Sequence, residues 1–328
     1  MALIPCCSLR NNVLILDDDL DMLKIVEATL RQYGYKSVCA SAPEQARRIL
    51  NNNNLTNNLL SNETSRVFDE DDIAALSIKM HISPLKDLVY NPDRFEPVTV
   101  LVVDFDMPNE NGLEFVQRLN NPDIKIIMLT GKAESGVVIK AFNDQVIHRY
   151  ISKGDPNYID TLVKYIQALQ NDFYVDLSQI IMEAIRKETK VFSNPEFIEI
   201  FNKLIQENNI VEYYILDESG SFLMLDATAE NQIWLIIKSE NDMKLYYELA
   251  SDDRGMTGDM LDKLKNKEII PFFMTEREEI FGDPKDWKLF KAKPLDQENN
   301  FYYAILINDE ALKIDKSRIK PYSVFINE

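Results

Sequence analysis

The chain has 328 residues, which is enough for two domains of ordinary size, and 45% of them are hydrophobic. Its net charge is −18, shared between residues 1–177 (17 basic against 25 acidic residues) and residues 178–328 (19 against 29). Affinity for nucleic acid depends on Lys and Arg contacts to phosphate, so this acidic balance argues against nucleic-acid binding by either half, apart from a local basic patch.

The three cysteines, Cys6, Cys7 and Cys39, form no CxxC motif and no Cys/His cluster, so we expect no zinc site and a reducing, cytoplasmic environment. The first ten residues have no basic segment of the kind that starts a signal peptide. Lipidation of the Cys6–Cys7 pair is a minor alternative. With no apolar run of about eighteen residues, we expect no membrane span.

In the first half, short apolar runs alternate with stretches of helical spacing. Strands are predicted at 12–16, 37–40, 98–103, 124–129 and 149–152, and helices at 20–30, 43–50, 113–119 and 158–169. Continuously apolar strands alternating with helices predict an α/β domain, with a doubly wound five-stranded parallel sheet covered on both faces.

Polar residues stand at the carboxyl ends of four of these strands, where ligand sites of such sheets lie. Asp17 and Asp18 follow the first strand, Asp104 the third, Thr130 the fourth and Lys153 the fifth. Carboxylate oxygens suit Mg²⁺, which neutralises charge on an incoming phosphoryl group so that an aspartate can attack it. A hydroxyl and an ammonium group can then hold the phosphoryl oxygens.

An insertion at about 51–96 interrupts the alternation, because 56 residues separate Ser41 from Val98 and a crossover needs about a dozen. It begins with an Asn-rich tract, continues with a predicted helix at 71–80, and ends in a stretch marked by prolines at 84–97. We interpret it as a tolerated loop, with a docking element as the alternative.

The second half predicts a separate α+β domain at residues 178–328. Its predicted helices lie at 177–189, 195–208, 242–249 and 257–265, and its strands at 212–216, 222–226, 232–237, 270–274 and 301–307. Residues 217–220 are a hairpin signal, which makes the first strands antiparallel. The many aromatic residues are expected in the core.

Five segments in order resemble response regulators with an N-terminal CheY-like receiver domain, which has the flavodoxin-like fold. They are LILDD (14–18), VVDFDMP (102–108), NGL (111–113), MLTG (128–131) and YISK (150–153), within residues 11–170. The chain also resembles, more weakly, a quorum-sensing response regulator with a non-standard output domain.

The resemblance implies that Asp104 accepts a phosphoryl group, and that Mg²⁺ is bound by Asp17, Asp18, Asp104 and the backbone carbonyl of Asp106. It makes Lys153 the partner of the phosphoryl group and Thr130 a hydrogen-bond donor to it.

Tyr150 matches the family's switch aromatic, which turns inward behind Thr130 on phosphorylation. Gly154 departs from the family pattern, which has proline there, and this puts the geometry of that loop in doubt. In the family pattern, the position of Lys132 faces the approach to the site.

The implied partners are a cognate histidine kinase or phosphotransfer protein and a second copy of the chain, which dimerises on phosphorylation through the fourth helix, fifth strand and fifth helix. The implied chemistry is the domain's own phosphorylation and dephosphorylation.

The output function has three alternatives. There is no GG[DE]EF motif and no P-loop, and His81 and His148 are the only histidines, which favours a protein-interaction switch. A Lys-rich stretch at 285–293 supports nucleic-acid binding. An enzyme acting on a nucleotide signal would need a metal pair such as Asp252 with Asp253 or Asp217 with Asp226.

Overall fold

The computed structural model describes residues 4–53, 88–119, 123–131, 136–186, 190–217, 219–252, 256–272, 284–297, 300–312 and 314–328. These residues form two compact units. The α/β unit contains described residues within 5–53, 88–179 and 320–328, and the α+β unit contains Ile4 and the described residues within 180–319. Most of the predicted insertion, including its helix at 71–80, lies outside the described residues.

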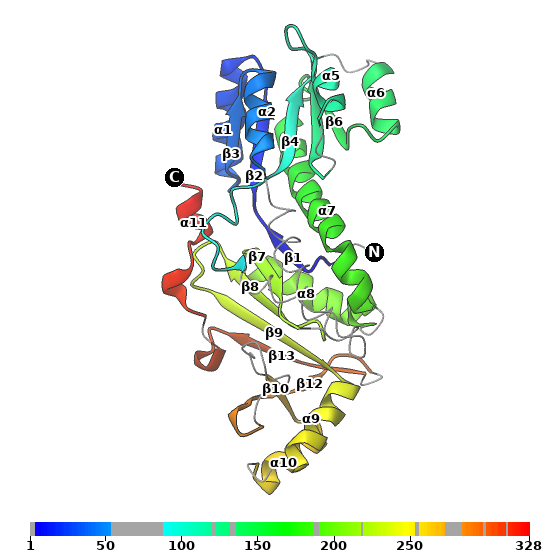
Figure 1. Cartoon of the computed structure of the whole chain (residues 1–328), viewed down its shortest axis with the longest axis vertical. Helices are drawn as coiled ribbons and strands as arrows, with labels where there is room; N and C mark the ends of the chain where they lie inside the picture. Colours follow the sequence, from blue (N-terminus) through cyan, green and yellow to red (C-terminus); the bar gives the residue numbers. More distant parts are fainter. Residues whose placement is uncertain are drawn as a thin grey trace, which may run out of the picture. The chain divides into compact units, whose positions relative to one another are not determined.

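The α/β unit is built on a five-stranded sheet (Figure 1). Its strands are β2 (Asn12–Leu16), β3 (Ser37–Ala40), β4 (Val98–Asp104), β5 (Lys125–Thr130) and β6 (Arg149–Ser152). Their order is β3-β2-β4-β5-β6, and every neighbouring pair is parallel. The predicted doubly wound parallel sheet is therefore confirmed, with its topological switch point between β2 and β4.

Helices cover both faces of this sheet. Alternate strand residues divide between two cores because successive side chains point to opposite faces. In β4, Leu101 and Val103 pack with one set of helices, and Val100 and Val102 pack with the other. The first set is α2 (Pro43–Asn51), α5 (Gly112–Gln117) and α6 (Gly136–Asn143), and the second is α1 (Leu20–Gln32) and α7 (Tyr158–Arg186). A short strand, β1 (Cys7–Leu9), precedes the sheet.

Helix α7 corrects one expectation. Separate helices were predicted at 158–169 and 177–189, but a single helix runs from Tyr158 to Arg186. No Gly or Pro interrupts this stretch, so nothing in the backbone ends the helix. Its apolar spacing also continues, because Leu162, Ile166, Leu169 and Phe173 are all buried.

The α+β unit has an antiparallel sheet in the order β7-β8-β9-β13-β12. These strands are β7 (Ile210–Ile215), β8 (Phe222–Asp226), β9 (Gln232–Ser239), β13 (Phe301–Ile307) and β12 (Lys293–Pro294). A second sheet pairs β10 (Ile269–Phe272) with β11 (Lys288–Lys291). The helices are α8 (Pro195–Glu207), α9 (Glu240–Asp252) and α10 (Gly258–Lys265). The predicted α+β arrangement is confirmed.

The aromatic residues of this unit are largely core residues, as expected. Phe222 packs against Phe201 with ring centroids 4.9 Å apart and against Tyr213 at 5.8 Å, while Trp234 packs against Phe272 at 6.0 Å. Phe222 and Trp234 are completely buried. Such edge-to-face pairs stabilise a core beyond the area that they bury.

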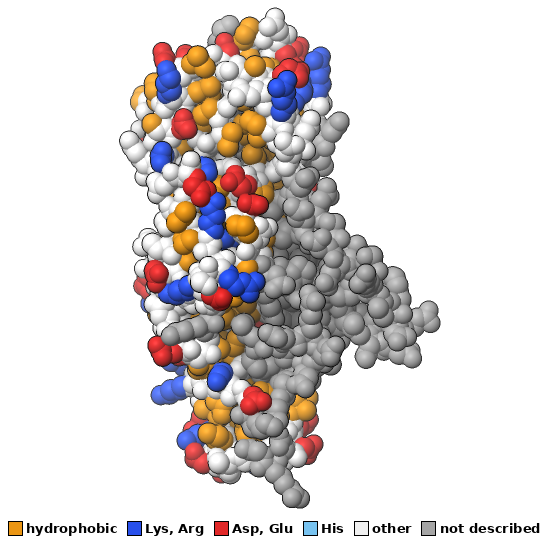
Figure 2. Space-filling view, turned by 60° about the vertical axis from the view of Figure 1, so that its left-hand side comes forward, with side chains coloured by type: hydrophobic (Ala, Val, Ile, Leu, Met, Phe, Trp, Pro, Cys, Tyr) orange, Lys and Arg blue, Asp and Glu red, His pale blue; other side chains and the backbone are white. Residues whose placement is uncertain are grey.

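The described surface mixes charges of both signs. Figure 2 shows Lys and Arg side chains interspersed with Asp and Glu on the face in view, with apolar side chains among them. Among the described residues, no helix is long and apolar enough to cross a membrane. The Cys6 and Cys7 thiols are buried, and burial raises the pKa of Cys6 to about 12, so neither is presented for lipidation in this structure.

His148 joins β5 to the start of β6. Its Nδ1 accepts a hydrogen bond from the Ile126 amide (3.0 Å), and its own amide donates to the Ile126 carbonyl (2.9 Å). Burial and, to a smaller extent, the positive charges of Lys125 and Arg149 lower the pKa of His148 to about 4. The folded protein therefore holds this imidazole neutral, because protonation would remove the acceptor.

We predict that His148 makes the folded state sensitive to acid. The pKa of His148 is lower in the folded protein than its ordinary value of 6.5. The neutral imidazole therefore stabilises the folded state above pH 6.5, and this contribution to stability is lost as the pH falls from 6.5 to about 4. The contribution to the free energy of unfolding is at most about 3 kcal/mol. His148→Asn keeps an acceptor for the Ile126 amide and cannot titrate. Its free energy of unfolding, measured by urea denaturation, should decline less than that of the wild type over this window, and parallel curves would contradict the assignment.

Candidate functional site

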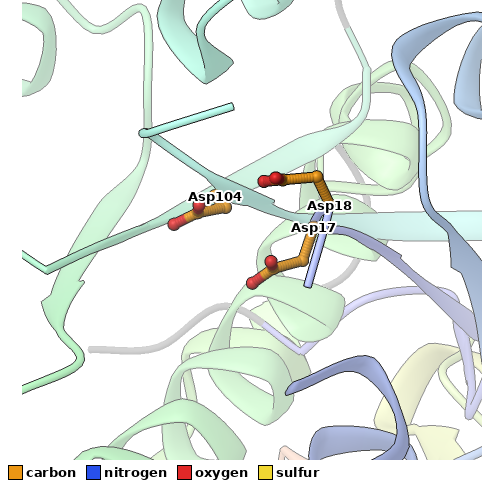
Figure 3. A group of neighbouring side chains, drawn as sticks. All are labelled: Asp17, Asp18 and Asp104. Carbon is orange, nitrogen blue, oxygen red and sulfur yellow. The ribbon is translucent and has the colours of Figure 1, made fainter. Parts of the chain in front are cut away.

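The switch point of the sheet gathers three aspartates. Asp104 is the last residue of β4, and Asp17 and Asp18 follow β2 directly. The ligand oxygens of the three carboxylates lie within 4.8 Å of one another, and Figure 3 shows them reaching one region from adjacent strands. Asp17 and Asp104 are only 3% and 5% exposed, whereas Asp18 is exposed. Within the described residues, this is the only such cluster of three potential metal ligands.

The neighbouring Asp19 has a different task. Its carboxylate caps α1 by accepting hydrogen bonds from the amides of Asp21 (2.9 Å) and Met22 (3.2 Å). Asp17 in turn accepts from the Asp19 amide (2.9 Å), which fixes one of its two oxygens. Asp19 is therefore the N-cap of α1, and the Asp18 side chain is left for the site.

Lys153 closes the site from β6. Its Nζ lies 2.7 Å from Oδ2 of Asp17 and 2.9 Å from Oδ1 of Asp104, so one ammonium group binds a carboxylate from each of two strands. Burial raises the pKa of Asp104, and the hydrogen bond from Lys153 opposes that rise. Burial disfavours the charge of Lys153, but its bonds to Asp17 and Asp104 outweigh this and raise its pKa.

The other predicted residues lie around this group. Thr130 ends β5 and is buried, and its carbonyl accepts a hydrogen bond from the Lys153 amide (2.8 Å). Asp106 is exposed in the loop after β4. Tyr150 is 37% exposed, and its ring lies edge-on to Phe142 of α6, with centroids 5.8 Å apart. Lys132 lies outside the described residues.

Gly112 allows the loop after β4 to close tightly. It is the first residue of α5, and its amide donates to the Phe105 carbonyl (3.1 Å). A Cβ atom here would overlap the carbonyl oxygen of Asp104 and lie 3.0 Å from Cγ2 of Val103. Because only glycine permits this approach, it fixes where α5 begins relative to Asp104.

The same loop is held from outside by an ion-pair network. Glu110 is 14% exposed, and Arg47 of α2 contacts both of its oxygens, at 2.8 and 2.9 Å. Arg118, which is largely exposed, contacts Glu110 at 2.9 Å. Both Arg47 contacts come from the same nitrogen, Nη2, and hydrogen bonds between charged groups are stronger than neutral ones. The network ties α2 to the loop that carries Asp106.

Comparison with known proteins identifies the family. The response regulator receiver domain family matches residues 74–167. The structure of the Legionella pneumophila response regulator LqsR is similar over 99% of this chain and 96% of that chain, with 31% sequence identity and a TM-score of 0.74. The chain belongs to the response regulator family.

Other solved structures are similar over about half of the chain. The Francisella response regulator 1452 receiver domain shares 17% identity and covers 49% of this chain and 98% of its own, with a TM-score of 0.33. A CheY-like receiver domain protein from Methanospirillum hungatei shares 18% sequence identity with this chain. The match covers 51% of this chain and 98% of that protein, with a TM-score of 0.32. No curated protein sequence matches the chain significantly.

The family match starts at residue 74 and so omits β2 and its aspartates. The long insertion separates them from the rest of the pattern, yet the sheet order puts Asp17 beside Asp104. As a response regulator, the chain acts in two-component signalling through a histidine kinase or another phosphodonor.

The geometry does not support Asp217 with Asp226 as a metal-binding pair in the output half. The Asp217 carboxylate binds Nζ of the buried Lys238 (2.8 Å) and the Ser221 amide (3.0 Å). Asp226 accepts hydrogen bonds from Thr228 and the Asn231 amide within its own turn. Asp217 and Asp226 therefore act as structural residues, and Asp253 lies outside the described residues.

Gly112 and Arg47 were not predicted as parts of the site. Gly112 appeared in the sequence only as part of the NGL segment (111–113), and the Asn-Gly pair was the available signal. Arg47 carried no signal, because its partner is 63 residues away.

We predict that Gly112→Ala destabilises the response regulator by about 2–4 kcal/mol, because the new methyl group forces α5 away from β4. Gly258→Ala is the matched control. It also changes the first residue of a helix, α10, but no atom lies within 4 Å of the added carbon. Its effect should stay within about 0.5 kcal/mol. Thermal unfolding of both variants measures the difference, and equal effects would show that the contact with Asp104 is unimportant.

Proposed function

We propose that this response regulator is phosphorylated on Asp104 in a Mg²⁺-dependent reaction, and that its receiver domain (residues 11–170) thereby controls its output domain (residues 178–328). The observation that carries the proposal is the cluster of three carboxylates within 4.8 Å, with a lysine ammonium 2.9 Å from Asp104. Like charges held this close create a site for cations.

The donors present fit Mg²⁺, which prefers oxygen ligands and is commonly bound by one or two carboxylates with water. We assign it to Asp17, Asp18, Asp104 and the backbone carbonyl of Asp106. When bound, the ion supplies positive charge between the acceptor carboxylate and the phosphoryl group. Asp18 is the exposed member of the cluster and so keeps the site open to solvent.

In the reaction, a carboxylate oxygen of Asp104 attacks phosphorus in a phosphohistidine of a cognate kinase or phosphotransfer protein, or in acetyl phosphate. A P–O bond to Asp104 forms as the bond from phosphorus to the donor breaks, and the donor leaves with the bonding electron pair. The ammonium of Lys153 and the hydroxyl of Thr130 bind oxygens of the transferred group. Attack of water on phosphorus would then break the P–O bond to Asp104, release inorganic phosphate and restore the carboxylate. The chain would thus catalyse its own phosphorylation and dephosphorylation.

Tyr150 is the proposed switch residue. Its exposed position beside Phe142 is the outward arrangement, and a shift of Thr130 toward the phosphoryl group would give the ring space to turn inward. Val137, Ile139 and Phe142 of α6 are also exposed. We assign these exposed side chains of α6, together with Tyr150, to homodimer formation, because exposed apolar side chains mark interaction sites.

We expect acetyl phosphate with Mg²⁺ to add one phosphoryl group to the full chain, detected by intact mass spectrometry. Asp104→Asn should abolish the addition because the nucleophile is removed. Asp106→Asn is the control, since it changes a nearby exposed carboxylate but keeps the backbone carbonyl. Unmodified wild-type protein, with acetyl phosphate and with a cognate kinase, would refute the proposal.

We predict that beryllofluoride with Mg²⁺ turns the wild-type chain into a dimer, measured by light scattering. Ile139→Ser should weaken this dimer at least about ten-fold, since interface residues at an apolar centre commonly contribute more than 1 kcal/mol. Being exposed, Ile139 is not needed for folding, so phosphorylation should be unchanged. A dimer of full strength in Ile139→Ser would assign dimerisation to another surface.

Nucleic-acid binding by the output domain is a second candidate. Lys288 and Lys291 of β11 and Lys293 of β12 are exposed, which favours contact with phosphates. Fluorescence anisotropy with labelled duplex DNA or RNA tests it. Binding that weakens steeply with salt, and further when the three lysines are replaced by glutamine, would support this candidate, and salt-independent signals would exclude it.

A further inference from the structure

The last nine residues of the chain pack on the receiver. Lys320–Glu328 belongs to the α/β unit, although the residues before it belong to the α+β unit. The short helix α11 (Tyr322–Phe325) buries Tyr322 and Phe325 almost completely around Phe95, with ring centroids 5.1 and 5.4 Å from that of Phe95. The prediction of an output domain at residues 178–328 did not include this packing.

Specific polar contacts fix this segment. The Tyr322 hydroxyl donates to the Gly34 carbonyl (2.9 Å), and Lys36 Nζ donates to the Phe325 carbonyl (3.0 Å). The same Lys36 ammonium lies 3.9 Å from the centroid of the Phe325 ring, a cation–π contact. A surface that offers one acceptor and one cation around a buried ring recognises a sequence, not merely an apolar chain.

This surface lies away from the aspartate cluster. Gly34 and Lys36 lie in the loop between α1 and β3, and Phe95 precedes β4, so all three are at the amino ends of the strands. Asp17 and Asp104 stand at the carboxyl ends of the same parallel strands. Changes at the C-terminal segment can therefore be separated from the chemistry at Asp104.

The same edge of the receiver also holds α7. The Tyr174 hydroxyl donates to the Asn11 side-chain oxygen, and Gln170 donates to the Asn11 carbonyl (2.8 Å). The Asn11 side chain donates to the Arg94 carbonyl (2.9 Å), and an Arg94 nitrogen donates to the Lys320 carbonyl (2.8 Å). Asn11 and Arg94, both buried, thus connect the chain segment that leads into residues 180–319 with the segment that leads out of them.

We propose that the surface formed by Gly34, Lys36, Arg94 and Phe95 is a peptide-binding site whose occupant is the chain's own C-terminal segment, residues 320–328. Its occupation holds the segment that follows residues 180–319 against the receiver, and its release frees that segment. The occupant is argued from the seated segment itself, with two buried aromatic side chains and three hydrogen bonds to its backbone or hydroxyl groups.

The test uses a chain that ends at Ile319 and a fluorescent synthetic peptide of residues 320–328. Anisotropy should show saturable binding to the shortened chain and none to the full chain, whose site is filled. The peptide carrying Phe325→Ala should bind at least about ten-fold more weakly, because it loses a fully buried ring. A shortened chain that keeps the wild-type circular dichroism spectrum but binds no peptide would overturn the proposal.

A second comparison covers the case in which the shortened chain does not fold. In the full chain, Phe325→Ala should speed hydrogen exchange both at residues 320–328 and at residues 33–37. Val324→Ala is the matched control, because the adjacent Val324 is 48% exposed. Equal exchange in the two variants would overturn the proposal. A wild-type dimer that Phe325→Ala dissociates would also overturn it, since the occupant would then be a second copy.

Discussion

The contact of one lysine ammonium with two buried carboxylates is the constraint on which the site depends. Asp17 and Asp104 come from neighbouring strands, and two such carboxylates cannot stay charged together under burial without a nearby cation. Lys153 supplies that charge at 2.7 and 2.9 Å from them. The strand order makes the arrangement possible, because the switch point between β2 and β4 brings the two aspartates to one crevice and β6 presents the lysine.

This arrangement explains why a cation and a phosphoryl group would act together at the site. The cluster holds three carboxylates against one ammonium, so it attracts a further positive charge. A phosphoryl group on Asp104 would draw Lys153 away from Asp17 and so loosen the link between β2 and β6. The close approach of Gly112 to Asp104 and the ion pair between Arg47 and Glu110 restrain the loop after β4. The proposed rearrangement on phosphorylation would therefore occur at Thr130 and Tyr150.

Local patterns predicted most of the fold and the centre of the site. The positions of Asp17, Asp104, Thr130 and Lys153 could be predicted because each residue ends or directly follows a single apolar strand. The remaining features depend on partners distant in the chain. Neither the packing of Phe325 on Phe95 nor the pairing of Arg47 with Glu110 leaves a periodic or compositional signal. The continuity of α7 was missed because a weakly apolar stretch resembles a helix end, although no Gly or Pro breaks it.

Calorimetric titration of Mg²⁺ into the wild-type chain and Lys153→Gln tests the central claim most directly. If Lys153 neutralises Asp17 and Asp104 in the absence of metal, its removal leaves the negative charges of both carboxylates uncompensated, and Mg²⁺ should bind more tightly. The account predicts one site per wild-type chain, with several-fold tighter binding in Lys153→Gln and none in Asp104→Asn. Identical affinities in the wild type and Lys153→Gln, or binding that persists unchanged in Asp104→Asn, would contradict it.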